Sequence, residues 1–492
     1  MIGLYPADDV RAAEAPLLAA TPEGALMQRA ATGLATVCLR LLDRVYGRRV
    51  ALLVGAGNNG GDALFAGARL ARRGARVTAV LLDRARTHPA GLAALRQAGG
   101  RVLDADGATP AIARADLVLD GMVGIGGRGG LRPAAAALAR AAAEGAGITV
   151  AVDVPSGVDA TTGAVDGEVF AAMHTVTFGA VKPGLVVGAG RNAAGQVHLI
   201  DIGLGPFLPP ARAFQLTDAD VADRLAAPTG DDDKYSQGVV GVVAGSAAYP
   251  GAAVLCTGAA LRTRPGLVRY AGTADDGVRA AWPEAIVTDG MPGEAGRVQA
   301  WVVGPGMGTD DDARARLAEV LATDRPVVVD ADALTMAAKE PAMLRNRRAA
   351  TVLTPHDREF ARFGGEPGAD RVAAARRLAA DLGVVVLLKG DATVVADPGG
   401  TAYVNGTGTP WLATAGTGDV LSGITGAVLA TSEATGLPAV EAAAMAAHLH
   451  GRAGQLAAER GPLIAGDLVR RLPEAIGRVR GNRQGGLGDS ES

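Results

Sequence analysis

The sequence predicts two successive α/β domains, each built on a largely parallel β-sheet. Short runs rich in Val, Ile and Leu alternate with Ala/Leu-rich helical stretches, and strands that are apolar throughout are typical of parallel sheets covered on both faces. The length of 492 residues is about twice that at which a single core stops growing. A segment rich in Pro and Gly, 202–238, interrupts the alternation and indicates the domain connection.

Each expected strand leads directly into a turn, and each of the following segments contains a strand and its turn. In the first domain these segments are 49–57, 75–83, 115–124, 147–157 and 174–180. In the second domain they are 239–246, 300–308, 325–334, 350–356, 383–390 and 392–397. We expect the domains to span 1–215 and 216–480, followed by a disordered polar tail at 481–492.

Charge and composition favour a small-molecule partner. The net charge is −3 with a pI near 6.1, and no long Lys/Arg block occurs, which argues against nucleic acid or an anionic membrane as the main partner. Cys38 and Cys256 are the two cysteines, too far apart in sequence for metal-ligand spacing and too few for a disulfide framework. We see no secretory signal and no apolar run long enough to span a bilayer, and therefore expect a cytoplasmic protein. The sequence leaves open whether the chain forms homo-oligomers.

The first strand leads into a glycine-rich turn. Gly55, Gly57 and Gly60 have the GxGxxG spacing of dinucleotide-binding turns, and Asp83 ends the next strand where a ribose-binding acid would lie. A plain nicotinamide-dependent dehydrogenase is therefore one interpretation. However, Asp62 falls in the first turn of the following helix, where its carboxylate would repel a pyrophosphate.

Oxygen-bearing side chains lie in or just before the turns that leave three expected strands of the first domain: Asn58, Asn59, Asp62, Asp120, Asp153 and Ser156. Ligands of parallel sheets bind beyond the carboxyl ends of the strands. Amide, hydroxyl and carboxylate oxygens suit a hard cation or the hydroxyl groups of a ligand. Any one of these residues could simply cap a helix, but three such clusters together indicate a binding site.

The second domain contains an expected anion site. Small residues at Ala415–Gly418 precede Asp419 and a long Ala/Leu-rich helix, so backbone amides can point at a phosphoryl group at the helix N-terminus. Asp419 can then accept a proton from an attacking hydroxyl group. Lys389 ends another strand, and His356 follows a third.

Four motifs of the first domain together resemble the N-terminal epimerase domain of bifunctional NAD(P)H-hydrate repair enzymes: "GAGNNGGD", "DGMVGIGG", "DVPSGVDATTG" and "FGAVKPG". The resemblance implies a potassium ion held by Asn59, Asp120 and Ser156. It also implies the substrate-binding residues Asn58, Asn59, Gly60, Gly61, Asp62, Gly124, Ile125, Gly126, Gly127, Arg128, Gly129, Gly130 and Asp153.

The chemistry implied for this domain is exchange between the R and S forms of hydrated NADH and NADPH. At C6 of the nicotinamide ring, hydroxide must leave and return on the other face, which requires an acid/base group. Asp153 is the catalytic candidate, and Lys182 is a second polar candidate.

Five motifs of the second domain resemble the ADP-dependent NAD(P)H-hydrate dehydratase domain: "KYSQGVVGVVAGSAAYPGAA", "GPGMG", "TPHDREF", "KGDATVV" and "AGTGDVLSG". By position, the hydrate-binding residues implied are Ala253, Gly308, His356 and Asp419. The nucleotide-binding residues implied are Lys389, Gly390, Asp391, Ala392, Thr393, Gly416, Thr417 and Gly418.

The two resemblances imply a Rossmann-like three-layer domain followed by a ribokinase-like α/β domain. They also imply a bifunctional enzyme, an epimerase (isomerase) and a dehydratase (lyase). ADP would transfer its terminal phosphoryl group to the C6 hydroxyl of the S form, and loss of phosphate would restore NADH or NADPH with AMP as the other product. Asp419 would be the base, the amides of Gly416–Gly418 the phosphoryl clamp, and Mg²⁺ the charge neutraliser.

Two other classes of function stay open at this stage. A glycine-rich anion site followed by Asp also occurs in ribokinase-like kinases, so the chain could phosphorylate a vitamin-precursor alcohol and carry an accessory Rossmann-like domain. A ligand-binding or scaffold protein is the other alternative. The presence of Asp62, Asp120, Asp153 and Asp419 argues against it.

Overall fold

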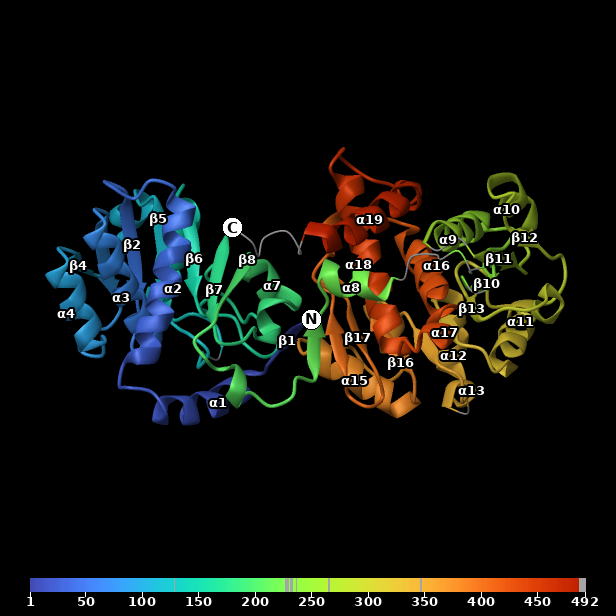
Figure 1. Cartoon of the computed structure of the whole chain (residues 1–492), viewed down its shortest axis with the longest axis horizontal. Helices are drawn as coiled ribbons and strands as arrows, with labels where there is room; N and C mark the ends of the chain where they lie inside the picture. The colour runs from blue at the N-terminus through green and yellow to red at the C-terminus, as the bar shows by residue number, and fades with distance from the viewer. Residues whose placement is uncertain are drawn as a thin grey trace. The chain divides into compact units, whose positions relative to one another are not determined.

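The chain folds into two compact units, Gly3–Arg212 and Met1–Ile2 with Ala213–Ser492, called here the N-terminal and C-terminal units (Figure 1). The computed structural model describes residues 1–127, 129–225, 230, 233–235, 237–263, 266–345 and 347–485. Both units are α/β structures with largely parallel sheets, which confirms the predicted fold class. No helix in these described ranges is long and apolar enough to cross a membrane.

The N-terminal unit is built on a parallel sheet in the order β4-β3-β2-β5-β6-β7-β8. The strands are β2 (Arg49–Val54), β3 (Arg76–Leu81), β4 (Arg101–Asp104), β5 (Leu117–Gly121), β6 (Ile148–Val152), β7 (His174–Phe178) and β8 (Gln196–Ile200). The short β1 (Ile2–Leu4) precedes them, and its Leu4 bridges to Val181.

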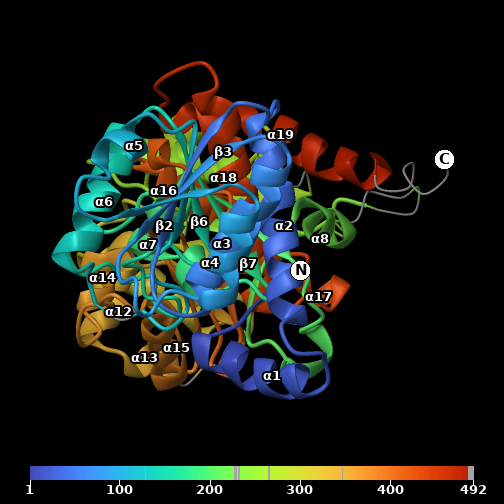
Figure 2. The same cartoon turned by 90° about the vertical axis from the view of Figure 1, so that its left-hand side faces the viewer.

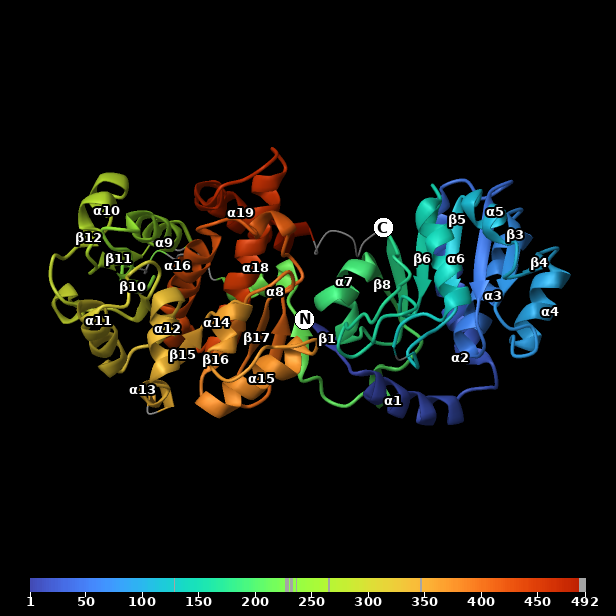
Figure 3. The same ribbon diagram turned by 180° about the vertical axis from the view of Figure 1, so that it is seen from behind.

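Helices cover both faces of this sheet. Val50 and Leu52 of β2 face a core that includes α2 and α3, whereas Ala51 and Leu53 face a core that includes α6. Figure 1 shows α2 in front of the sheet, and Figure 3, the view from behind, shows α6 in front of it. Figure 2 shows α2 and α3 along one face of the sheet. The helices are α1 (Ala7–Ala19), α2 (Ala25–Leu42), α3 (Asn58–Arg72), α4 (Pro89–Gln97), α5 (Thr109–Ala113), α6 (Pro133–Glu144) and α7 (Gly188–Ala194).

The strand order places the functional loops of this unit together. From β2 the chain runs outward to β3 and β4 on one side, and it then returns to build β5 on the other. The loops leaving β2 and β5 are therefore neighbours that diverge at a topological switch point, where open α/β sheets bind ligands. Asn59 and Asp120 belong to these two strand ends.

The C-terminal unit has a larger mixed sheet in the order β9-β18-β17-β16-β15-β14-β13-β10-β11-β12. Pairing is parallel from β12 to β16 and antiparallel for β16–β17 and β17–β18. The strands are β9 (Ala213–Gln215), β10 (Val239–Val243), β11 (Leu267–Tyr270), β12 (Ile286–Val287), β13 (Ala300–Val303), β14 (Val327–Val329), β15 (Thr351–Leu353), β16 (Val385–Leu388), β17 (Val394–Ala396) and β18 (Ala402–Val404).

The helix that carries the expected anion site, α16, packs very closely on its neighbours. A Cβ on Gly423 would lie 2.2 Å from the carbonyl oxygen of Cys256 in α9, and one on Gly426 would lie 2.2 Å from Val302 of β13. The glycines thus let α16 approach both elements. The helices are α8 (Asp218–Arg224), α9 (Pro250–Thr263), α10 (Asp275–Ala281), α11 (Asp311–Ala322), α12 (Ala331–Lys339), α13 (Ala342–Arg345), α14 (Asp357–Ala361), α15 (Arg371–Leu382), α16 (Thr417–Leu429), α17 (Ser432–Thr435), α18 (Ala439–Ala458) and α19 (Ala465–Gly485).

Two expected boundaries differ from the structure by a few residues. β9 begins at Ala213 and pairs with β18, so the second unit starts slightly before the expected residue 216. α19 continues to Gly485 and includes the first residues of the expected tail at 481–492, because extending an existing helix costs far less than starting one. Residues 486–492, like Asp231 and Asp232 of the expected domain connection, lie outside the described residues.

Candidate functional sites

Asp120 and Ser156 form the centre of the N-terminal site. Asp120 is fully buried near the end of β5, and its carboxylate accepts hydrogen bonds from the Ser156 N–H (2.8 Å), the Ser156 hydroxyl (2.7 Å) and the Met122 N–H (3.1 Å). Burial raises the pKa of Asp120 to about 6, against the lowering effect of these hydrogen bonds. A cation beside it would favour the ionised carboxylate.

Asn59 comes close to the same loop. A Cβ on Gly124 would lie 3.0 Å from Cγ of Asn59, so glycine is needed for the loop after β5 to meet the first turn of α3. The Asn59 Nδ2 atom is buried without a hydrogen-bond partner among the described residues. The carbonyl oxygen of Val123 lies 3.1 Å from the Ser156 hydroxyl and adds an oxygen that sequence reasoning missed, because a backbone carbonyl leaves no sequence signature.

Asp153 forms a buried ion pair with Lys182. The Lys182 ammonium lies 2.6 Å from Asp153 Oδ1 and also donates to the Thr177 hydroxyl (2.9 Å) and the Phe178 carbonyl (3.2 Å). Lys182 is 1% exposed. Asp153 has a φ of 67°, a left-handed conformation that Asp tolerates better than most residues.

The charge of Asp153 acts on two further carboxyl groups, those of Asp62 and Glu14. Asp62 is buried in the first turn of α3, and its Oδ1 atom has no hydrogen-bond partner among the described residues. Burial, and then the negative charges of Asp153 and Glu14, raise the pKa of Asp62 well above its usual range. Burial and the charge of Asp153 likewise raise the pKa of Glu14, although Lys182 opposes them.

Glu14 was not singled out from the sequence. It lies on α1 in the face of the helix that buries Val10, Ala13 and Leu17, and an acid inside such an apolar stripe is the signal that could have found it. Arg11, one turn earlier, donates to the Ile125 carbonyl at 2.8 Å and so fastens α1 to the expected substrate loop.

The other predicted substrate residues of this unit lie on the same two segments. Asn58 is exposed at the start of α3, where Gly60 allows close approach to the Gly55 carbonyl. The loop after β5 carries Gly124, Ile125, Gly126, Gly127, Gly129 and Gly130. Arg128 lies outside the described residues.

The C-terminal site is centred on the N-terminus of α16. Gly416 caps this helix with a φ of 85°, and Asp419 lies half-buried in its first turn. Of the expected clamp Gly416–Gly418, the Thr417 N–H donates to the Thr414 carbonyl at 3.3 Å and is not free for a ligand. The first-turn N–H groups of Gly418 and Asp419 have no hydrogen-bond partner among the described residues. Burial, and then the charge of Asp330, raise the pKa of Asp419 to about 7, against the effect of Lys389.

The Lys389 ammonium faces this helix end. A Cβ on Gly418 would lie 3.6 Å from Lys389 Nζ. The same ammonium lies 2.8 Å from Asp330 Oδ1 and 3.7 Å from Glu359 Oε2. A cation, free N–H groups and a carboxyl group with a pKa near neutrality are the parts required to bind a phosphoryl group and to remove a proton beside it.

Asp330 and Asp332 are the residues of this site that sequence reasoning missed, since 325–334 was interpreted only as a strand. Asp330 follows β14, and its Oδ2 atom accepts a hydrogen bond of 2.7 Å from the Ser422 hydroxyl. Asp332 accepts a hydrogen bond of 2.9 Å from the Gly308 N–H. The signal for Asp330 is an acid directly after an apolar strand, whereas Asp332 lies two residues further, in the first turn of α12.

The remaining predicted residues surround this centre. The His356 ring is exposed and caps α14 through Nδ1, while the His356 N–H donates to Glu359 at 2.9 Å. Ala253 is buried in the first turn of α9. The turn between β16 and β17 carries Gly390, Asp391, Ala392 and Thr393. Among the described residues, no group of three His, Cys, Asp or Glu side chains is arranged to hold a metal ion.

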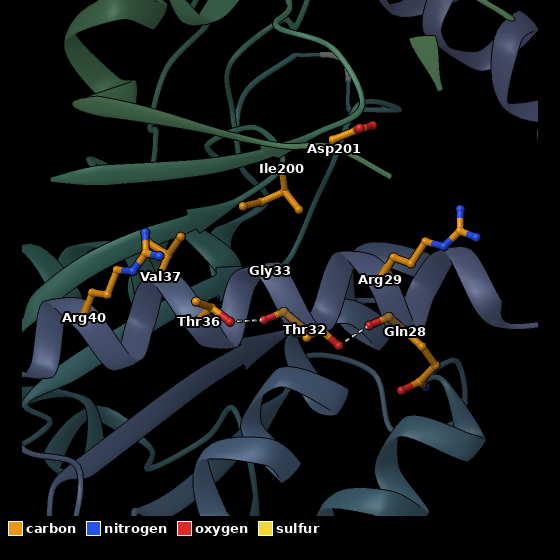
Figure 4. A pocket seen from close by; sticks show the side chains of 9 residues that line it. All are labelled: Gln28, Arg29, Thr32, Gly33, Thr36, Val37, Arg40, Ile200 and Asp201. Atoms are coloured by element: carbon orange, nitrogen blue, oxygen red, sulfur yellow. Dashed lines mark hydrogen bonds between the residues drawn. The ribbon is translucent and has the colours of Figure 1, made fainter. Parts of the chain in front are cut away.

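A groove of about 550 Å³ lies elsewhere on the N-terminal unit (Figure 4). It runs along α2 beside the end of β8, where Gly33 allows Ile200 to approach the helix. Its lining residues are Gln28, Arg29, Thr32, Gly33, Thr36, Val37, Arg40, Ile200 and Asp201. None of them is a predicted site residue, so the groove is separate from the site around Asp120.

Comparison with known proteins matches a different family model to each unit. The model described as YjeF-related protein N-terminus matches residues 23–184, and the model described as NAD(P)H-hydrate dehydratase matches residues 240–477. Among solved structures, the ADP/ATP-dependent NAD(P)H-hydrate dehydratase from Bacillus subtilis, co-crystallised with ATP/Mg²⁺, is 28% identical. It covers 54% of this chain and 98% of its own, with a TM-score of 0.48.

The fold, with a different family model matched to each of its two α/β units, defines an enzyme with two domains. The bifunctional NAD(P)H-hydrate repair enzyme Nnr of Mycobacterium tuberculosis is 55% identical to this chain, over 89% of this chain and 91% of its own length. The enzyme of the same name from Mycobacterium leprae is 52% identical, over 97% of this chain and 98% of its own length. The chain belongs to the family of bifunctional NAD(P)H-hydrate repair enzymes. The predicted function, epimerase and dehydratase on one chain, is thereby confirmed.

Proposed function

We propose that the N-terminal unit carries the epimerase reaction and the C-terminal unit the dehydratase reaction. The family model named for the dehydratase falls wholly within the C-terminal unit, which supports this division. The observation that carries the assignment is the difference between the two centres. One has a buried carboxylate–ammonium pair, and the other has a cation facing a helix N-terminus beside a carboxyl group with a pKa of about 7.

In the epimerase site, Asp153 is the proposed acid/base group. The hydroxyl at C6 of the hydrate leaves with a proton, the ring nitrogen supplies its electron pair to C6, and water adds to the opposite face and returns a proton. Lys182 holds Asp153 in place through the 2.6 Å contact. The substrate would lie against 58–62, 124–130 and Asp153.

A potassium ion fits beside this site. Asn59, Asp120 and Ser156 lie on three segments that the structure brings together, and carboxylate, hydroxyl, amide and carbonyl oxygens are the donors that hard cations prefer. The fully buried Asp120 carboxylate has no cationic partner among the described residues. When bound, the ion would supply positive charge that keeps Asp120 ionised.

In the dehydratase site, Asp419 is the proposed base and ADP the phosphoryl donor. Asp419 takes the proton from the C6 hydroxyl, whose oxygen attacks the terminal phosphorus of ADP and releases AMP. Phosphate then leaves C6, and loss of a proton from C5 restores the ring double bond. Lys389 and the N–H groups of Gly418 and Asp419 stabilise the charge on the transferred phosphoryl group.

Nucleotide and hydrate are proposed to contact opposite sides of this centre. The nucleotide would contact 389–393 and 416–418, and the hydrate would contact Ala253, Gly308 and His356. Mg²⁺ would arrive with the nucleotide phosphates, which agrees with the lack of a three-ligand protein cage among the described residues. The ion would neutralise phosphate charge during transfer.

The proposed partners are NADH hydrate, NADPH hydrate and ADP. The small net charge supports small-molecule partners over nucleic acid. We also propose that the chain works in the cytoplasm, where nicotinamide cofactors turn over.

The test combines both activities in one tube. Purified protein is given the R form of NADPH hydrate with ADP and Mg²⁺, and return of dihydronicotinamide absorbance is measured. The wild type should convert it fully, whereas Asp153→Asn should leave it unconverted, although the same variant should still convert the S form when that form is supplied. A stable phosphorylated alcohol would instead support a kinase, and R-form conversion by Asp153→Asn at the wild-type rate would refute the assignment of that residue.

A further inference from the structure

Asp330 connects three separate parts of the C-terminal unit. Its side chain is 2% exposed, with Oδ1 bound to Lys389 at the end of β16 and Oδ2 bound to Ser422 of α16. Its backbone carbonyl packs on the turn after β13, where a Cβ on Gly304 would lie 1.9 Å from it. Both carboxylate oxygens are therefore used inside the protein.

The contact with Ser422 ties Asp330 to the helix of the proposed base. Ser422 lies three residues after Asp419, so both side chains project from the same face of α16. The Asp330 carboxylate thus links the Lys389 ammonium to α16, the helix that carries Asp419.

We propose that Asp330 is a positioning residue of the dehydratase reaction, which fixes the Lys389 ammonium at the Gly418 backbone and sets the distance between this cation and Asp419. This inference rests on the proposed function. Lys389 has a second acid, Glu359, at 3.7 Å. Without Asp330, that acid would draw the ammonium away from the helix end.

The charges of the site agree with this role. Burial alone would raise the pKa of Asp330, but the charge of Lys389 and the hydrogen bonds of Lys389, Ser422 and Thr354 outweigh it and lower that pKa. Burial would lower the pKa of Lys389, but Asp330 and then Glu359 raise it. Among the described residues, the ionisable groups that interact with Asp419, with Lys389 or with the first turn of α16 are Asp330, Asp332, Glu359, Cys256 of α9 and His450 of α18.

The test compares Asp330→Asn with Asp332→Asn. Both changes remove one negative charge that acts on Asp419, but only Asp330 holds Lys389. For Asp330→Asn we expect ADP to bind about tenfold more weakly, and the half-maximal pH of dehydration to fall by roughly one unit. For Asp332→Asn we expect ADP affinity within about twofold of the wild type, because it contacts Gly308 and not the cation. ADP binding is measured by calorimetry without hydrate, so a loss of turnover does not hide the result.

Ser422→Ala tests the hydrogen bond between Asp330 and α16. It leaves the Asp330–Lys389 pair intact and removes the hydrogen bond between Asp330 and α16, so kcat for dehydration should fall while KM for ADP stays unchanged. The epimerase activity of the same chain and the tryptophan fluorescence transition, which reports the C-terminal unit, show whether each variant is folded.

The outcomes separate this inference from the proposed function. Unchanged ADP affinity in folded Asp330→Asn, or an equal loss in Asp332→Asn, would overturn the positioning role. Unchanged kcat in Ser422→Ala would overturn the link to α16. A wild-type chain that binds ADP but does not dehydrate the hydrate would refute the proposed function, while the predicted difference in ADP affinity would still be measurable.

Discussion

Replacing Lys182 by Met tests how much the buried ion pair between Lys182 and Asp153 stabilises the N-terminal unit. The ammonium is 1% exposed and donates three hydrogen bonds, to Asp153, Thr177 and Phe178. Removing it leaves the Asp153 carboxylate buried, with Thr177 and Phe178 losing a donor. Breaking a buried pair in this way costs about 3–5 kcal/mol, so we expect the free energy of unfolding of the N-terminal unit to fall by that amount. Epimerase activity should be lost.

The sequence offers a way to assign the loss to one unit. All three tryptophans, Trp282, Trp301 and Trp411, lie in the C-terminal unit. Denaturant unfolding followed by tryptophan fluorescence therefore reports that unit, whereas far-UV circular dichroism reports both. Lys182→Met should move the circular dichroism transition and leave the fluorescence transition in place.

The double variant Asp153→Asn/Lys182→Met is the matched control. Removing the second charge should recover about 2 kcal/mol or more of the lost stability without restoring epimerase activity, since the buried charge is then gone. If Lys182→Met were within about 1 kcal/mol of the wild type, or if the double variant were no more stable than the single one, the buried-pair reasoning would be wrong.

Three other outcomes are expected. The dehydratase rate should rise as pH increases through about 7, because Asp419 must be ionised to accept a proton and its pKa lies there; Asp419→Asn should abolish dehydration and keep epimerisation, and a rate independent of pH would contradict this. Ser156→Ala should weaken the proposed activation of the epimerase by potassium and destabilise the N-terminal unit by about 1–3 kcal/mol, since Asp120 loses one hydrogen bond; titration with potassium chloride against choline chloride measures the first effect. Glu14→Gln should slow epimerisation several-fold without changing dehydration, whereas an epimerase rate equal to that of the wild type would show that Glu14 is not part of the N-terminal site.

The fold was predictable because buried parallel strands leave a strong pattern. β2, β5, β10 and β16 are nearly continuous apolar runs, and each lies within a predicted strand. Edge strands such as β4 are short and exposed, so their composition does not separate them from loops. The sheet order, which makes the β2 and β5 loops neighbours, also has no local signal.

The candidate sites were predictable where side chains follow strands in recognisable motifs. Asn59, Asp120 and Ser156 were named from such motifs, and the structure brings them together. Glu14 and Asp330 were missed for different reasons. Glu14 comes from a helix far along the chain from the loops it meets, and the role of Asp330 depends on contacts with Lys389 and Ser422 that only the folded chain makes.

The residue between the two missed aspartates, Ala331, has a φ of 48°. An alanine in this left-handed conformation costs roughly 1–2 kcal/mol, which the packing of β14 and α12 must offset. Glycine at 331 would relieve that strain yet let the backbone between Asp330 and Asp332 sample more conformations. Stability and turnover are therefore expected to move in opposite directions at this position, so selection for heat resistance alone could favour a poorer catalyst here.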